Sequence, residues 1–123
     1  MDFVQNKKRL DKLVRQFAEN VAAQTEAIRR GDANSGNKHA ERYIRAFEAL
    51  QSLGDQGRDG LVPLMFEGRD DVRAMAAAFL LRYRHDDACQ VLQSLARGEG
   101  FVALSAAAAL ERWEEGDWQL DPA

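Results

Sequence analysis

The residues best suited to metal chemistry in this chain lie together in the second half of the sequence. His85 is followed directly by Asp86 and Asp87, and these three side chains could supply one corner of a divalent-metal site. They fall in a turn before a helix, however, where aspartate commonly caps the helix by accepting its free amide hydrogens. Capping is therefore the favoured interpretation, and no metal site is predicted.

The remaining signals for chemistry also have structural explanations. His39 is far from His85 in sequence, and neither belongs to a pattern such as His-Glu-x-x-His. Cys89 is the single cysteine, so it cannot form an internal disulfide, and we interpret it as a small buried residue of a helix. The glycines are spaced as helix stops and not as a phosphate-binding loop. The sequence therefore predicts no catalytic residue, no cofactor and no metal, and the protein is not expected to be an enzyme.

The elements that would position any functional residue are predicted to be helices. Apolar residues at helical spacing indicate one face of a long helix between Phe3 and Ile28. Turn-forming residues at 31–37 are expected to end it. A second helix is expected to run to about Leu53 and to stop at the glycines that follow. The apolar faces of the two helices comprise Phe3, Leu10, Leu13, Val14, Phe17, Val21 and Ile28, and Tyr43, Ile44, Phe47, Leu50 and Leu53.

The rest of the chain repeats itself with a period of about thirty residues. The shift places Ala46 on Ala76 and Ala106, Leu50 on Leu80 and Leu110, Leu61 on Val91, Met65 on Leu95, Gly68 on Gly98, and Val72 on Val102. Each unit reads as an alanine-rich helix, a polar turn, a second helix and a glycine-containing connection, with Pro63 early in a short helix. This pattern predicts stacked helical hairpins, in which Phe79, Leu80, Tyr83, Leu110 and Trp113 fill the space between layers.

These residues resemble a HEAT-type repeat. The likeness rests on the Val72-Arg73 step with the alanines that follow, on His85-Asp86-Asp87-Ala88, and on Val91-Leu92-Gln93-Ser94-Leu95. The whole chain is similar to a family of small bacterial HEAT-like proteins catalogued as a domain of unknown function. That likeness rests on residues 17–28, on Gly31-Asp32 with Asn37, and on the closing segment 110–118. Ala103 replaces the repeat's arginine in the last unit, which therefore resembles a cap.

The resemblance implies an all-α fold, a short right-handed α-α superhelix (a HEAT/armadillo-like solenoid) of stacked hairpins with about six helices. The expected organisation is one domain over 1–123, with a long helical pair at 1–54 and repeats with a C-terminal cap at 55–123. It also implies that Arg73 reaches toward acidic groups of a neighbouring repeat. Such families have been suggested to contain immunity proteins that neutralise a toxin.

The charge distribution suggests the kind of partner. Residues 1–45 carry a net charge of +4 and residues 46–123 a net charge of −7, which suits binding of a basic protein by the acidic half. We therefore predict a non-catalytic protein-binding module, an immunity protein acting by occlusion in the case that the resemblance suggests. The predicted partner-binding residues are Arg58, Asp59, Glu67, Gln90, Gln93, Arg97, Glu114, Glu115, Asp117 and Trp118.

Two further possibilities stay open from the sequence. The basic residues Lys7, Lys8, Arg9, Lys12 and Arg15 could bind nucleic acid. Because Asp11 interrupts the run and no aromatic residues alternate with it, a solvated helix face is the favoured interpretation and nucleic acid is not the expected partner. The long first helix could also pair with a second copy of itself. Trp118 has two interpretations, either an anchor for the partner or a side chain that folds back and closes the last helix pair.

Composition limits the remaining classes. A hydrophobic fraction of 46% beside a charged fraction of 30% is typical of a globular, soluble protein and not of a disordered one. The richest apolar stretch, Met75–Leu81, is far too short to span a bilayer, and the first residues lack the apolar run of a signal peptide. A cytoplasmic protein is expected, with no membrane association and no small-molecule substrate.

Overall fold

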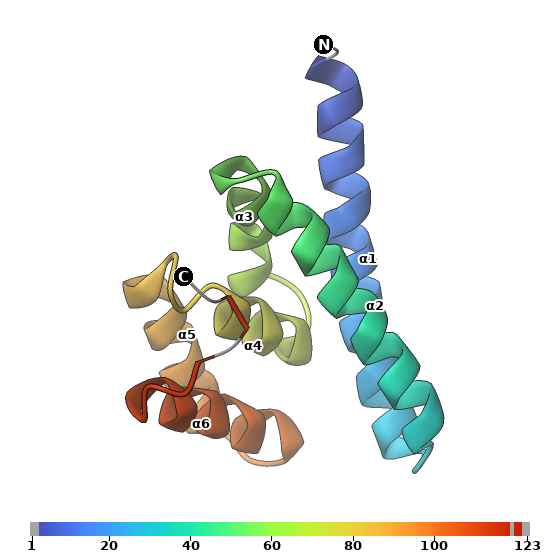
Figure 1. The fold of residues 1–123 in the computed structure, drawn as a ribbon. Coiled ribbons are helices and arrows are strands. Elements are labelled where there is room, and N and C mark those ends of the chain that lie inside the picture. The colour runs from blue at the N-terminus through green and yellow to red at the C-terminus, as the bar shows by residue number, and fades with distance from the viewer. Residues whose placement is uncertain (1–2, 119, 122–123) are drawn as a thin grey trace. The chain divides into compact units, whose positions relative to one another are not determined.

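The computed structural model describes residues 3–118 and 120–121, and for residues 3 and 4 the backbone alone. In that part of the chain every regular element is a helix (Figure 1). The elements are α1 (Phe3–Arg29), α2 (Ala33–Ser52), α3 (Asp55–Leu61), the 3₁₀ helix η1 (Val62–Met65), α4 (Asp70–Phe79), α5 (His85–Ala96) and α6 (Phe101–Glu114). The prediction of an all-α protein with about six helices is confirmed, whereas the superhelical arrangement stays a prediction.

The chain divides into two compact units, Met1–Leu61 and Val62–Ala123, called the first and second units below. The first unit is built on an antiparallel hairpin of α1 and α2, with α3 packed against both helices. Phe17 of α1 meets Tyr43 of α2 edge to face, with ring centroids 5.8 Å apart. Phe17, Val21, Phe47 and Leu50 are almost completely buried, as the apolar spacing predicts.

Three details of this hairpin differ from the sequence prediction. The turn is shorter than expected, because Asp32 accepts a hydrogen bond from the Ser35 amide (3.1 Å) and caps α2 at its start. Ile28 and Ile44 are 42% and 40% exposed, since Ile28 lies in the last turn of α1 and Ile44 lies beside the buried stripe of α2. The side chain of Phe3 lies outside the described part.

Glycines allow the helices of the first unit to approach closely. Gly36 is buried in α2 near Ala27 and Ile28 of α1. Gly57 of α3 is buried against the backbone of Leu50, so close that a Cβ atom there would lie 2.6 Å from the Leu50 carbonyl carbon. Between α2 and α3 the chain turns at Gly54, whose φ of +74° is the left-handed conformation that glycine adopts without strain.

The second unit consists of η1 and helices α4 to α6. Helix α4 packs against η1, α5 and α6, and α5 packs against α6. Ala76 of α4 and Ala106 of α6, which the thirty-residue shift aligns, are both buried, at 0% and 1% exposure. Leu80 and Leu92 are completely buried, whereas Tyr83, Leu110 and Trp113 are half-buried. Pro63 is the second residue of η1, at the start of a helix as expected, where its missing amide hydrogen costs little.

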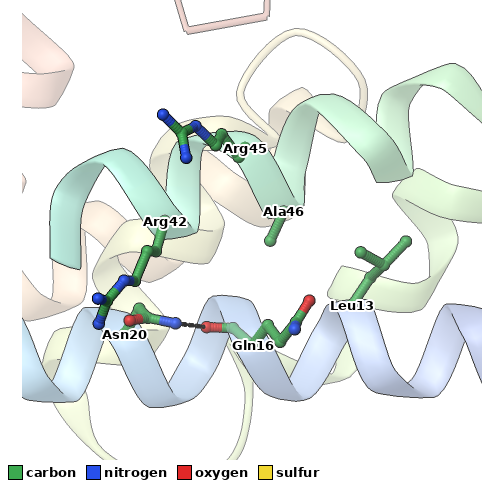
Figure 2. A pocket seen from close by; sticks show the side chains of 6 residues that line it. All are labelled: Leu13, Gln16, Asn20, Arg42, Arg45 and Ala46. Atoms are coloured by element: carbon green, nitrogen blue, oxygen red, sulfur yellow. Dashed lines mark hydrogen bonds between the residues drawn. The ribbon is translucent and has the colours of Figure 1, made fainter. Parts of the chain in front are cut away.

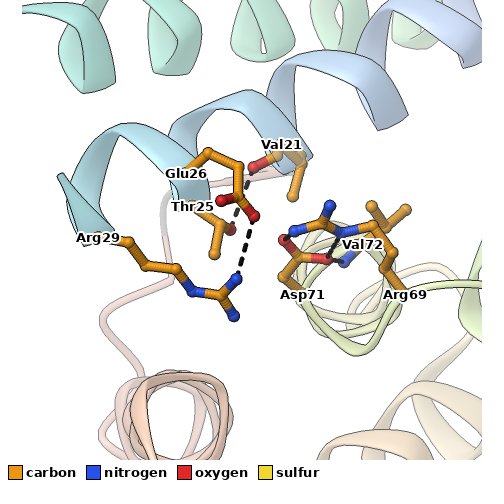
Figure 3. A network of polar contacts seen from close by, with 7 residues as sticks. All are labelled: Val21, Thr25, Glu26, Arg29, Arg69, Asp71 and Val72. Atoms are coloured by element: carbon orange, nitrogen blue, oxygen red, sulfur yellow. Dashed lines mark hydrogen bonds and ion pairs between the residues drawn. The ribbon is translucent and has the colours of Figure 1, made fainter.

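Arginines close to the first turn of α4 interact locally. Arg69 binds Asp71 through two contacts, Nε to Oδ1 and Nη2 to Oδ2, each 3.0 Å, and Asp71 also accepts the Val72 amide hydrogen (Figure 3). Arg73 donates to the Met65 carbonyl (3.0 Å) and pairs with Asp70 (3.2 Å). The two aspartates therefore supply negative charge to the first turn of α4. Arg73 therefore contacts its own turn and η1, whereas the resemblance implied an acidic group of a neighbouring repeat.

A separate ion pair closes the last turn of α1 in the first unit. Arg29 Nη1 lies 3.0 Å from Glu26 Oε1, one turn earlier on the same helix, and Thr25 donates its hydroxyl hydrogen to the Val21 carbonyl (Figure 3). Both arginine and glutamate are largely exposed, so this pair contributes little to stability.

Candidate protein-binding site

Helix α6 carries apolar side chains on two opposite faces. Ala103 and Ala106 point into the second unit and are buried. On the other side Phe101 is 51% exposed and Leu104 is 72% exposed, and Ala107 and Ala108 are exposed beside them. We call Phe101, Leu104, Ala107 and Ala108 the open face. Their spacing of three and four residues places them in one stripe along the helix.

The equivalent positions of the preceding repeat are covered. Residues thirty positions before the open face are Asp71, Ala74, Ala77 and Ala78 of α4, which are between 0% and 9% exposed. Helix α4 packs against α6, whereas in the described residues no further hairpin follows α6. Positions that are buried on α4 therefore correspond to exposed apolar side chains on α6. Clustered exposed apolar side chains are typical of interaction sites.

Acidic residues continue from the open face toward the end of α6. Glu111 and Glu115 follow Leu104 and Ala108 by seven residues each, which keeps them on the same side of the helix. Glu114 and Asp117 are exposed close by. These four residues are called the acidic end. A partner lying along α6 would therefore meet an apolar stretch first and a negatively charged stretch next.

The residues after α6 fold back onto the second unit. Gly116, with a φ of +79°, turns the chain, and Trp118 then packs edge-on against Trp113, with ring centroids 5.9 Å apart. Arg82 holds the segment by donating from Nε to the Asp121 carbonyl (2.6 Å), and its guanidinium lies 5.8 Å from the centre of the Trp113 ring. Trp118 is half-buried and Asp121 is 1% exposed. This is the arrangement expected of a closing side chain.

Cys89 and His85 lie close to one another on α5, as the two members of a catalytic pair would. Cys89 Sγ lies 3.6 Å from His85 Nε2 and 3.8 Å from Nδ1, one turn away on α5. Burial, followed by the charges of Asp86 and Glu114, raises the pKa of the Cys89 thiol above its ordinary value. An activated cysteine needs the opposite shift, because the thiolate is the nucleophile. The arrangement therefore does not favour nucleophilic catalysis.

The raised pKa predicts that the Cys89 thiol reacts slowly with alkylating reagents. At pH 8 Cys89 should react with iodoacetamide more slowly than a free cysteine derivative, since a raised pKa leaves less thiolate at that pH. Replacing Glu114 by glutamine should increase the rate at pH 8, because it removes one of the negative charges. The rate is measured from pH 7 to 10 by mass spectrometry of the intact protein. A Cys89 rate equal to that of the free derivative across this range would contradict the assignment.

The predicted partner-binding residues lie on both units. Arg58 and Asp59 belong to α3 of the first unit, where Arg58 is half-buried and Asp59 exposed. The other eight belong to the second unit and, except for the half-buried Trp118, are exposed. They lie in the turn after η1 (Glu67), on α5 and its end (Gln90, Gln93, Arg97) and on α6 and the segment after it (Glu114, Glu115, Asp117, Trp118). A continuous surface through all ten stays a prediction.

Phe101 and Leu104 were not among the predicted residues. Helical spacing in the sequence puts Val102, Ala106, Ala109, Leu110 and Trp113 on one apolar stripe, and Phe101 and Leu104 lie off that stripe. In the structure Ala106 is buried and the other four stripe residues are half-buried. The sequence signal for an exposed apolar site was the presence of two large apolar residues, Phe101 and Leu104, outside the predicted stripe of an alanine-rich helix. That signal identifies an exposed position only when the buried side of the helix is already known.

Neither family models, nor curated proteins, nor solved structures gave a match to this chain. Within the described residues no three histidine, cysteine, aspartate or glutamate side chains lie close enough together to hold a metal ion. Likewise, none of the described helices is both long enough and apolar enough to cross a membrane. The candidate site is therefore argued from the surface of α6 itself.

Proposed function

We propose that this protein is a non-catalytic binding module whose second unit receives an amphipathic helix of a basic partner protein on α6. The observation that carries the proposal is the open face, because its equivalent on α4 is buried whereas on α6 it is exposed. A helix of the partner would bury these positions, as their equivalents on α4 are buried. Helix-in-groove recognition of this kind uses apolar anchors at three- and four-residue spacing.

The size of the effect follows from burial. Phe101 and Leu104 are the large side chains of the open face, and complete burial of one such side chain contributes about 1.5–3 kcal/mol. Ala107 and Ala108 lie beside them, and their small side chains allow the backbone of a second helix to approach. Side chains at the centre of an interface commonly supply most of its binding energy. Leu104 is therefore the expected anchor point.

The acidic end determines the charge of the partner. Glu111, Glu114, Glu115 and Asp117 lie beyond the apolar stretch, and residues 62–123 carry eleven acidic and six basic residues. Charge complementarity accelerates association with a basic surface and disfavours an acidic one. A toxin neutralised by occlusion is the specific case implied by the HEAT-like resemblance. Under this proposal its contact region would be a basic helix.

The test is a substitution on the open face. Leu104→Asp should weaken partner binding at least about tenfold, because it places a charge where an apolar side chain must be buried. Leu104 is 72% exposed, so the free energy of unfolding should change by no more than about 0.5 kcal/mol. Phe66→Asp is the matched control, since Phe66 is 54% exposed in the same unit but lies outside α6.

Binding is measured in two steps. The tagged wild type and both variants are used to capture proteins from source cells, and a protein retained by wild type and Phe66→Asp but lost by Leu104→Asp is purified and titrated calorimetrically. The partner should be basic at the contact, and its association rate should fall with added salt. An acidic contact surface, or equal capture by Leu104→Asp, would contradict the proposal. A concentration-dependent dimer that Leu104→Asp dissociates would assign the open face to a second copy instead.

Nucleic-acid binding by the first unit is the alternative proposal. It is supported by five exposed basic residues on α1: Lys7, Lys8, Arg9, Lys12 and Arg15. Several phosphate contacts would make affinity for single-stranded RNA fall steeply between low and moderate salt. Measurements of fluorescence anisotropy at several salt concentrations test this alternative independently of α6. No change in anisotropy at low salt would remove it.

A further inference from the structure

A pocket with two unpaired arginines lies between the helices of the first unit. It is lined by Leu13, Gln16 and Asn20 of α1 and by Arg42, Arg45 and Ala46 of α2, and its volume is about 290 Å³ (Figure 2). All six residues belong to the α1–α2 hairpin. This volume is at the lower end of the range for pockets that hold small organic molecules.

The residues that line this pocket carry two positive charges. No acidic residue lines it. Among the described residues neither Arg42 nor Arg45 has a hydrogen bond or an ion pair, although Glu41 and Glu48 lie close to them along α2. Both arginines are exposed, so their guanidinium groups can reorient at little cost. Two cations without partners at one pocket favour an anionic ligand.

Hydrogen bonds hold Asn20 in place at the wall of the pocket. Asn20 donates from Nδ2 to the Gln16 carbonyl (2.8 Å), and its Oδ1 lies 2.9 Å from Nδ1 of His39 on α2. This contact joins α1 to α2 at one end of the pocket. Arg42 extends from α2 toward Asn20, whereas the Arg45 guanidinium is turned away from α1 (Figure 2). Gln16 has no hydrogen bond through its side chain among the described residues, which leaves its amide available to a ligand.

We propose that this pocket binds a small organic phosphomonoester, with the phosphate held by Arg42 and Arg45. A phosphate monoester carries a charge close to −2 at neutral pH, which matches two guanidinium groups, whereas a carboxylate would neutralise only one. The planar guanidinium group binds phosphate oxygens through two parallel hydrogen bonds. Leu13 and Ala46 provide an apolar floor for the organic part, and the Gln16 amide provides a polar contact.

Adenosine 5′-monophosphate is the probe for this site, and adenosine is its uncharged counterpart. Titration of ¹⁵N-labelled protein should give saturable shifts for the Gln16 side-chain amide and for α1 and α2 signals around it, with no such shifts for adenosine. Arg42→Gln and Arg45→Gln should each weaken binding about tenfold or more, because each removes a charged donor pair. Both residues are exposed, so circular dichroism should show unchanged helix content.

The matched control is Arg15→Gln. Arg15 is exposed on α1 and does not line the pocket, so this variant removes the same charge from the same unit and should change the affinity less than twofold. Equal weakening by Arg15→Gln would show attraction by net charge alone and would overturn the proposal. So would the absence of saturation at millimolar adenosine 5′-monophosphate, or equal binding of adenosine.

Two other probes distinguish the source of the phosphate. Inorganic phosphate should compete, but more weakly, because it lacks the part that would contact Leu13 and Ala46. A single-stranded oligonucleotide that binds more tightly than the mononucleotide, with a loss of affinity in Arg9→Gln and Lys12→Gln as large as in Arg42→Gln, would show a nucleic-acid surface along α1. That result would overturn the small-ligand assignment and support the alternative function.

Discussion

Replacing Gly57 by alanine is expected to destabilise the first unit by about 3 kcal/mol or more, which is a large part of the stability of a small domain. The added Cβ would lie 2.6 Å from the carbonyl carbon of Leu50 and 3.0 Å from its Cα, so α3 must move away from α2. The atoms that a Cβ would meet belong to the Leu50 backbone, which cannot move aside as the end of a flexible side chain can. Thermal and urea unfolding followed by circular dichroism measure the loss.

Gly36→Ala is the matched control for this substitution. A Cβ at Gly36 would meet Ala27 Cβ at 3.8 Å, an ordinary contact, and Gly36 lies inside α2. Alanine is preferred over glycine within helices by up to about 1 kcal/mol, so this variant should be as stable as wild type or more stable. If Gly57→Ala and Gly36→Ala unfolded at the same urea concentration, the close approach of α3 to α2 would be wrong.

Replacing Trp113 by alanine is expected to destabilise the second unit by about 2–4 kcal/mol, near the usual range for removal of a large packed ring. Trp113 is half-buried, and its ring contacts those of His85 (5.3 Å between centroids) and Trp118 (5.9 Å), with the Arg82 guanidinium over it. Its removal should release Trp118. The expected readout is a red shift of the Trp118 fluorescence, together with a lower unfolding midpoint.

Trp113→Phe separates loss of packing from loss of one fluorophore. Phenylalanine retains a ring at the centre of the cluster while leaving Trp118 as the single tryptophan, so its emission should stay blue-shifted from that of an exposed indole. Acrylamide should quench Trp118 more strongly in Trp113→Ala than in Trp113→Phe. Equal quenching in the two variants would show that Trp118 does not depend on the Trp113 ring.

Helix positions and core residues could be predicted from the sequence where the apolar period was clear. Phe17, Val21, Phe47 and Leu50 are buried as the spacing required, and the thirty-residue shift correctly paired the buried Ala76 with Ala106. The limits of α2 were less predictable, because a single cap by Asp32 starts the helix inside a segment rich in turn formers. Local propensity favoured a longer turn there.

Surface sites were harder to predict because they depend on what packs beside each helix. Phe101 and Leu104 lie off the predicted apolar stripe of α6, and their exposure is established only once the helix is seen to pack with Ala103 and Ala106 inward. The pocket of the first unit combines Gln16 with Arg42 and Arg45, which are distant in sequence and meet only because α1 and α2 are antiparallel. The basic run on α1 alone did not point to the α2 arginines.

The open face has a consequence for how this molecule could be enlarged. The open face of α6 is exposed, whereas the positions thirty residues earlier on α4 are buried. A duplicated hairpin fused after α6 would therefore find a ready template and add to the existing core instead of competing with it.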